Sequence, residues 1–356
     1  MANNTFLFFE LVRVALGTSI SLSRSPSDEE WLELFIMAQK QAIAGVVFES
    51  LEELTKYGQI PPRPVLYEMI GISEQIKQQN EIVNKRCLEV IELLADMGFR
   101  STILKGQGNG MMYPRPTSRQ PGDIDVWVDG DKKNIITAVH NLYPKSKVRE
   151  HHVDFPVFKD VDVEVHFFPT FSVVGRFEKR LKMFFDGHRS EQFTNKIQLI
   201  NGGEINAPTL EFNLIYQMSH MMRHFFAEGI GMRHILDYYF LLLKSFQVTG
   251  TKNLTCDFQY FGMKRFAGAV MWVLHNFLGL ENRYLLIEPD QKRGELLVDE
   301  IIRSGNFGQY DKRLAKDLKG TSATLSILIR NFRFVRLFPE EAISAPITGL
   351  IKRFIR

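Results

Sequence analysis

Two short apolar segments that carry acidic residues in alternation constrain this chain more than any other feature. The first, "GDIDVWV", contains Asp123 and Asp125, and the second, "VDVEVHF", contains Glu164. Aspartate is depleted in strands, because its short carboxylate competes for backbone hydrogen bonds and fits a pleated surface badly. Successive side chains of a strand point to opposite faces, so Asp123 and Asp125 are predicted to share a face with Trp127, with Cα atoms roughly 7 Å apart. Both carboxylates are therefore predicted to point toward the same region above one face of the strand.

Helical patterns on both sides of these segments predict a chain in three parts. Residues 1–97 form an N-terminal helical region, 98–205 an α/β core, and 206–356 a C-terminal helical region, which together make an α+β fold with a mixed sheet. The segments "HHVDFPVF" and "VDVEVHFFP" are predicted to be antiparallel strands joined by a tight turn. Helices are predicted at about 26–54 with Ser25 as the N-cap, 65–96, 132–142, 208–226, 231–245, 263–279, 290–304 and 311–337.

Composition narrows the classes of protein to which this chain can belong. It is 45% hydrophobic and 24% charged with a net charge of +3, so the whole molecule is not an electrostatic nucleic-acid binder. Cys87 and Cys256 lie far apart without a Cys/His cluster, which argues against a structural zinc site and indicates two core thiols in a reducing compartment. The N-terminus has no basic residues before its short apolar run, and no apolar run approaches the roughly 18 residues of a membrane span. We therefore expect a cytoplasmic protein.

The acidic pattern is typical of a site for hard divalent cations. Mg²⁺ prefers oxygen ligands and is usually held by one or two carboxylates together with substrate phosphates. Two metal ions about 3.5–4 Å apart can stabilise both the attacking and the leaving oxygens of a phosphoryl displacement, and a third carboxylate helps to hold them. Asp123 and Asp125 fit the first role, and Glu164 is the candidate third ligand. The alternative is that both aspartates merely face solvent on an edge strand.

Candidate phosphate-binding residues lie close to the acids in the sequence. In "ILKGQGNG" a strand runs into a glycine-rich turn, where backbone N–H groups can face a phosphate and Gly106 permits close approach. Lys105 offers a point charge, and Arg119 offers a planar fork that suits phosphate.

Taken together, these motifs resemble the nucleotidyltransferase superfamily of the DNA polymerase β type. More closely, "LKG" (104–106), "YPRPTSRQPGDIDVWV" (113–128), "VEVHF" (163–167) and "SHMMRHFFAEGIGMRHILDYYFLL" (219–242) resemble the bacterial uncharacterised nucleotidyltransferase family over about residues 85–245. The resemblance implies a nucleotidyltransferase-type core. It also implies these roles: metal ligands Asp123, Asp125 and Glu164, the phosphate-side Gly106, and triphosphate contacts Lys105 and Arg119.

Some neighbouring residues have two interpretations. His166 shares the face of Glu164, so we expect it to orient a metal ligand or to touch the nucleotide. The alternative is a hydrogen-bonded, half-buried histidine near the end of a strand. His220 and His224 are four residues apart, yet the glutamate of a His-Glu-x-x-His zinc motif is absent, which favours packing or a helix that lines the cleft. Arg233 and Asp237 have the spacing of a salt bridge along a helix.

One position departs from the superfamily pattern. Gln107 follows Gly106 where a serine is usual, so the serine hydroxyl contact to phosphate is missing and other groups must hold the triphosphate.

The resemblance implies Mg²⁺-dependent transfer of an NMP from an NTP such as ATP to a hydroxyl group, with two Mg²⁺ ions and release of pyrophosphate. A small molecule, a sugar, a protein or an RNA is compatible as the acceptor. The alternative is a catalytically weak module that binds a nucleotide or a partner protein in the same cleft. The basic, amphipathic segment 328–356 has the composition of a membrane- or RNA-binding helix, but we expect it to pack on its own domain with a solvated basic face.

Overall fold

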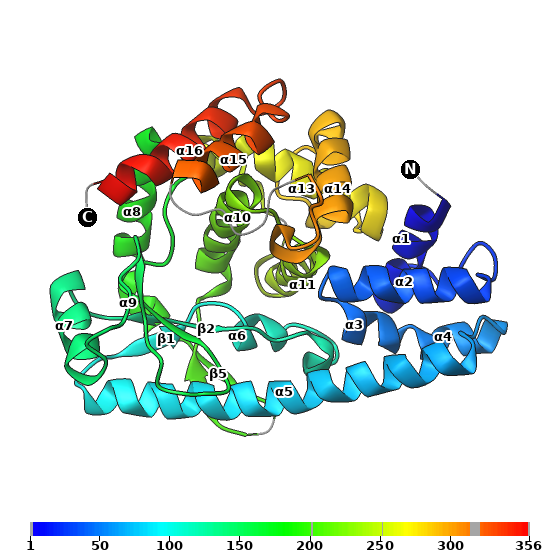
Figure 1. Ribbon diagram of the computed structural model, residues 1–356, viewed down its shortest axis with the longest axis horizontal. Coiled ribbons are helices and arrows are strands. Elements are labelled where there is room, and N and C mark those ends of the chain that lie inside the picture. Colours follow the sequence, from blue (N-terminus) through cyan, green and yellow to red (C-terminus); the bar gives the residue numbers. More distant parts are fainter. Residues whose placement is uncertain (1–2, 201, 251, 314–320, 355–356) are drawn as a thin grey trace.

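A small mixed sheet lies at one end of a largely helical molecule (Figure 1). The computed structural model describes residues 3–200, 202–250, 252–313 and 321–354. Within these residues the sheet has the strand order β1-β2-β4-β3, in which β2 and β4 run parallel and both edge strands are antiparallel to their neighbours. The strands are β1 (Ser101–Ile103), β2 (Ile124–Val128), β3 (His152–Asp154) and β4 (Val163–His166). The predicted α+β class is confirmed, and so is the antiparallel pairing of β3 with β4.

The N-terminal region is helical, as expected, but its first long helix is broken into shorter ones. Its elements are α1 (Asn3–Ala15), α2 (Asp28–Lys40), α3 (Ala44–Glu49), α4 (Leu51–Leu54), the 3₁₀ turn η1 (Thr55–Tyr57) and α5 (Arg63–Asp96). The chain turns after α2 at Ala42. The φ of Ala42 is +56°, which lies outside the right-handed helical region and ends the helix there. The predicted cap at Ser25 is wrong by two residues: Ser27 caps α2, and its hydroxyl accepts a hydrogen bond from the Glu30 N–H.

Helix α5 runs along the base of the molecule and supports two hydrophobic cores (Figure 1). Near its C-terminal end, Val83 and Val90 pack with the apolar face of the sheet. Near its N-terminal end, Val65 and Met69 pack in the larger core formed by the surrounding helices. The helix therefore joins the two predicted regions that meet near residue 97.

Between the sheet strands and the C-terminal helices, the chain forms several short elements. They are α6 (Gln107–Gly110), η2 (Pro116–Ser118), α7 (Lys132–Leu142), η3 (Gly175–Phe177), α8 (Glu178–Gly187), α9 (Arg189–Gln192), and the two-stranded β5 (Lys196–Gln198) and β6 (Glu204–Asn206). The helix predicted at 132–142 is confirmed as α7. The sequence pattern predicts no elements for 168–205, where α8, α9 and the β5–β6 pair lie.

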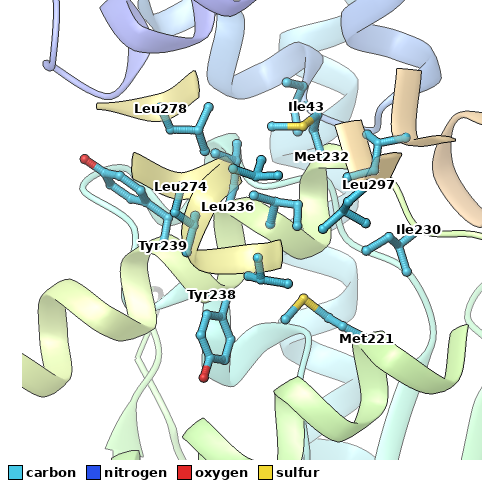
Figure 2. Packing of buried hydrophobic residues seen from close by; sticks show 14 of the residues in the cluster. Ile43, Met221, Ile230, Met232, Leu236, Tyr238, Tyr239, Leu274, Leu278 and Leu297 are labelled. Atoms are coloured by element: carbon cyan, nitrogen blue, oxygen red, sulfur yellow. The ribbon is translucent and has the colours of Figure 1, made fainter. Parts of the chain in front are cut away.

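The C-terminal helices share their core with the N-terminal ones. They are α10 (Leu210–Ala227), α11 (Met232–Thr249), α12 (Thr255–Tyr260), α13 (Lys264–Leu278), η4 (Asn282–Tyr284), α14 (Gln291–Ser304), η5 (Asn306–Gly308), α15 (Thr321–Phe332) and α16 (Pro339–Phe354). Figure 2 shows Ile43 beside Met232, with Leu236, Leu274 and Leu297 close by. The N-terminal and C-terminal helices are also joined by a hydrogen bond, in which the Met232 N–H donates to Gln41 Oε1 at 3.0 Å.

The basic C-terminal segment packs on its own chain, as predicted, and residues 355–356 of it lie outside the described residues. Phe334 and Phe338 are buried, and α16 contacts α10. The expected solvated basic face is only partly present, because Arg330 is buried and Arg333 forms an ion pair with Glu300.

Two further expectations meet different outcomes. Cys87 is buried, but Cys256 is exposed, so the prediction of two core thiols is wrong for Cys256, which lies on the outer side of α12. Among the described residues, no helix combines the length and the apolar character that crossing a membrane requires.

Candidate active site

The parallel pairing of β2 with β4 places two of the predicted acids side by side. Asp125 pairs with Glu164, and Trp127 pairs with His166. Residues that pair directly across a ladder point to the same face of the sheet. Asp125 is only 2% exposed, whereas Glu164 is half-buried. The polar side chains that alternate along β2 and β4, Asp125, Glu164 and His166, therefore form one polar patch. This patch lies on the face of the sheet opposite the valine-rich core.

Asp123 stands at the rim of this patch. It directly precedes β2 and is exposed. Repulsion by the Asp125 carboxylate raises the pKa of Asp123. The two negative charges therefore interact unfavourably, and a cation placed between them would relieve that repulsion.

Lys105 provides the positive charge beside the acids. Its Nζ lies 3.0 Å from Asp125 Oδ2 and 3.3 Å from His220 Nε2. Burial acts to raise the pKa of Asp125, but the Lys105 ammonium and the His166 ring outweigh it and hold that pKa well below its ordinary value. Asp125 is therefore a carboxylate near neutral pH.

Gly106 ends the segment that carries Lys105 and begins α6. Its φ of +63° and ψ of −107° are values that side chains with a Cβ rarely adopt. The residue after it, Gln107, is buried and donates hydrogen bonds to the Asn80 and Asn84 side chains of α5. This contact explains the glutamine after Gly106, because its side chain joins α6 to α5.

Two imidazoles extend the acidic patch. His166 Nε2 lies 2.9 Å from Asp125 Oδ1 and 3.4 Å from Glu164 Oε2, while His166 Nδ1 donates to the Phe168 carbonyl at 3.2 Å. Burial acts to lower the pKa of His166, but its hydrogen bonds to Asp125 and Glu164 raise it to about 9. His152, which pairs with His166 across β3 and β4, has its Nδ1 3.2 Å from Glu164 Oε2.

These side chains fit a divalent cation. Asp125, Glu164 and His166 offer ligand atoms that all lie within 4.8 Å of one another, and the same holds for His151, His152 and His166. Carboxylate oxygens suit Mg²⁺, and imidazole nitrogens suit transition metals. His152 is not among the residues predicted for the site from the sequence. The signal was present in "HHVDF", because a strand paired antiparallel with β4 brings one of its histidines beside His166.

Arg119 does not point freely into this patch. Its Nε and Nη2 lie 2.7 and 2.8 Å from the two oxygens of Asp237 on α11, and Arg119 is 5% exposed. The Tyr113 hydroxyl also donates to Asp237, at 2.7 Å. Burial acts to raise the pKa of Asp237, but the Arg119 guanidinium outweighs it and keeps that pKa below its ordinary value. The triphosphate contact expected of Arg119 would require this buried pair to open.

The expected salt bridge between Arg233 and Asp237 is replaced by other partners. Arg233 Nη1 donates to the backbone carbonyls of Gln120 and Pro121, at 3.2 and 3.4 Å. Arg119 and Arg233 therefore both fix the loop that leads into Asp123, one through Asp237 and the other through the backbone.

Helix α10 lines the side of the patch next to Lys105. His220 contacts Lys105 as described, and Arg223 Nη2 lies 2.7 Å from His224 Nε2. The Arg223 guanidinium also lies 5.3 Å from the centre of the Phe171 ring. Burial lowers the pKa of His224 to about 4, so this ring is neutral near pH 7. The sequence predicts a helix that packs or lines the cleft for these histidines, and Arg223 is not among the residues it predicts for the site.

A comparison with protein families shows to which family the chain is similar. The model of the uncharacterised nucleotidyltransferase family matches residues 27–279, which is well over half of the chain and includes every site residue described above. Neither the curated proteins nor the solved structures contain a match to this chain. The family match and the acidic patch on β2 and β4 agree, and the chain belongs to the uncharacterised nucleotidyltransferases, a family of nucleotidyl-transferring enzymes.

Proposed function

We propose that this protein transfers an NMP from an NTP, for example ATP, to a hydroxyl group of an acceptor molecule and releases pyrophosphate. The observation that carries the proposal is the pairing of Asp125 with Glu164 on adjacent parallel strands, with Lys105 at 3.0 Å from Asp125. The family to which the chain belongs supports it. Asp123, at the rim, lies near enough for the charges of Asp125 and Glu164 to raise its pKa, and we assign it as the third acid.

In this proposal the acids form a site for up to two Mg²⁺ ions. The bound ions would neutralise the triphosphate and polarise the α-phosphoryl group. Asp123 and Asp125 would be the main ligands of such an ion. Glu164, which is half-buried, or a second metal ion would help to remove the proton of the acceptor hydroxyl. His166 is 1% exposed beneath these acids, so we assign it to holding Asp125 and Glu164 in place.

The cationic side chains divide into two groups. Lys105 borders the acids, and Arg223 contacts His220, which in turn contacts Lys105. We assign both cations to the triphosphate oxygens, with Gly106 allowing the backbone to come close. Arg119 and Arg233 form the other group, which fixes the loop before Asp123 and acts on catalysis through the position of that carboxylate. A point charge such as Lys105 neutralises phosphate without imposing the bidentate geometry of an arginine.

The second candidate is a module that binds a nucleotide or a partner protein without efficient turnover. No feature of the acidic patch favours it, because the three acids, the lysine and the flexible glycine are all present together. The two candidates differ in one measurable respect: both bind NTP with Mg²⁺, but only the enzyme releases pyrophosphate.

The test is to incubate the full chain with Mg²⁺ and each of the four NTPs, labelled at the α-phosphate, in the presence of a cell extract. We expect pyrophosphate release and transfer of label to one fraction of small molecules, sugars, proteins or RNA. Asp123→Asn should abolish both. Asp162→Asn, a change of an exposed aspartate just before β4, is the matched control and should have no effect. Nucleotide binding by calorimetry without any label transfer would favour the binding module.

A further inference from the structure

Helix α15 carries apolar side chains on its outer face and polar side chains on the face toward the protein. Four exposed apolar residues, spaced three or four positions apart, form what we call the apolar stripe: Leu325, Leu328, Ile329 and Phe332. On the opposite face Arg330 and Asn331 are buried, and Asn331 Nδ2 donates to the Phe226 carbonyl at 2.8 Å. A surface helix ordinarily turns its apolar face to the core. The stripe therefore has the character of a surface that an apolar partner covers.

Helix α16 adds to this apolar surface. Ile343 and Ile347, four positions apart and so on one face of the helix, are both exposed. The helix packs against α15, and both lie along the edge of the molecule farthest from α5 (Figure 1). The most exposed side chain of the set, Phe332, is 79% exposed. Exposed apolar residues that gather in this way mark an interaction surface.

A cationic cleft adjoins α16. Its volume is about 720 Å³, and the charged residues that line it are Arg176, Arg180, Lys264, Arg265, Glu340 and Glu341. Glu340 forms an ion pair with Arg176, and Glu341 forms one with Arg265. The four cations therefore outnumber the two acids, and both acids are already neutralised. Such a cleft suits an anionic group such as a phosphate.

The cleft and the exposed isoleucines lie on the same side of α16. Residues three or seven positions apart share a face of a helix, and Ile343 and Ile347 stand in this relation to Glu340, which lines the cleft. An occupant of this side would therefore meet cationic and apolar side chains together. A phospholipid presents a phosphate headgroup next to acyl chains, which is the complementary arrangement.

We propose that helices α15 and α16 seat this protein on an anionic phospholipid bilayer without crossing it. The apolar stripe and the two isoleucines enter the boundary between headgroups and acyl chains, and the cationic cleft holds headgroup phosphates. The inference is independent of the proposed function, because none of these residues belongs to the acidic patch. It places the enzyme at a membrane surface.

The charges of the segment favour a bilayer over the other occupants of such a face. Residues 321–356 contain six Arg or Lys residues and only two acids, Glu340 and Glu341. Two copies of the chain joined through this face would bring like charges together without acidic partners. RNA would satisfy the cleft but would leave the aliphatic side chains of the stripe in water, which costs free energy.

The experiment is co-sedimentation of the full chain with vesicles of phosphatidylcholine, alone or mixed with phosphatidylglycerol. We expect binding to the mixed vesicles that salt weakens and little binding to pure phosphatidylcholine. The double variant Ile329→Ser/Phe332→Ser should bind the mixed vesicles at least roughly tenfold more weakly. Lys264→Gln, a change of an exposed cation of the cleft, should weaken binding roughly fivefold. Tyr67→Ser, on α5, is the matched control because Tyr67 is 67% exposed, and it should bind as the unaltered protein does.

A second measurement locates the contact directly. In Phe332→Trp the new indole should be quenched by mixed vesicles that contain brominated acyl chains, and the unaltered protein gives the background of its own tryptophans. Urea unfolding checks that each variant folds. Equal vesicle binding by the unaltered protein and the double variant, absence of quenching at position 332, or binding of RNA but not of vesicles would each overturn the proposal. So would a dimer in light scattering that the double variant makes monomeric. Pyrophosphate release without vesicles bears on the proposed function alone, so the two can fail separately.

Discussion

At the scale of single residues, the two aspartates of β2 and its approach have different physical roles. Asp125 is buried between Lys105 and His166, so its charge is compensated on both sides. Asp123 is exposed, and its main electrostatic interaction is repulsion by Asp125. The two residues therefore contribute differently to stability although both are proposed to contribute to catalysis.

This difference leads to a prediction for two isosteric variants. Asp125→Asn should lower the free energy of unfolding by about 1.5–3 kcal/mol, because the buried Lys105 and His166 lose a charged hydrogen-bonding partner. Asp123→Asn should leave the free energy of unfolding unchanged or slightly higher, because repulsion is removed. Urea unfolding measures both, and pyrophosphate release should be lost in both. A larger loss of stability in Asp123→Asn than in Asp125→Asn would contradict this account.

The two cysteines should differ sharply in reactivity. Burial raises the pKa of the Cys87 thiol to about 12, and its position in the sheet core blocks access, whereas Cys256 is exposed. A thiol reagent at pH 8 is expected to modify one cysteine in the folded protein and two in urea, since the thiolate is the reactive form. Mass spectrometry of the labelled peptides identifies the site. Modification of Cys87 in the folded protein would show that the core opens near β2.

At the scale of secondary structure elements, the pattern of alternating residues was sufficient to predict the acidic face of the sheet. Strand alternation has a fixed period, so Asp125, Glu164 and His166 were assigned to their faces correctly from spacing alone. The partner of Arg119 was beyond such reasoning, because Asp237 lies 118 residues away and no local pattern encodes that contact. The role of Gln107 was missed for the same reason, since its partners lie on α5. Spacing also predicts that Arg233 pairs with Asp237. In the structure Asp237 pairs instead with Arg119, and Arg233 donates to a backbone carbonyl.

The Arg119–Asp237 pair should stabilise the packing of α11 against the loop before Asp123. Asp237→Asn leaves the buried guanidinium without a counter-charge, so we expect a loss of about 3–5 kcal/mol in the free energy of unfolding at neutral pH. Arg119→Lys should weaken the binding of a nucleoside monophosphate and a triphosphate equally, because Arg119 acts through the loop. A selective loss of triphosphate binding would instead place Arg119 against the β- or γ-phosphate.

The same pair has a defined dependence on pH. The folded-state pKa of Asp237 lies below its ordinary value of 3.8, so the carboxylate is favoured by folding. The stability it supplies is fully present above the unfolded-state pKa and is lost as the pH falls through the lower, folded-state value. Urea unfolding of the unaltered protein and of the double variant Arg119→Met/Asp237→Leu between pH 6 and pH 3 should show a steeper loss in the unaltered protein. Parallel curves would mean that the pair does not titrate in this way.

At the scale of the whole molecule, the hydrophobic core of the sheet extends across the predicted boundary near residue 97. Val83, Cys87, Val90 and Leu94 of α5 form the layer beneath the sheet, although they precede that boundary. A fragment of residues 98–205 therefore lacks one side of its core, and we expect it to show no cooperative urea transition by circular dichroism. The full chain is the control. A sharp transition in the fragment would establish residues 98–205 as an independent domain.

The contacts between the two ends of the chain also determine when this protein can fold during synthesis. Arg13 Nε of α1 donates to the Phe277 carbonyl at 2.8 Å, and Gln41 Nε2 donates to the Ile301 carbonyl at 2.8 Å. The N-terminal helices leave the ribosome first, but more than 200 further residues must be translated before their partners appear. At roughly 5–20 residues per second this delay lasts on the order of ten seconds or more. During that interval the apolar faces of the first helices are exposed, which makes the nascent chain, more than the finished enzyme, the natural client of a chaperone.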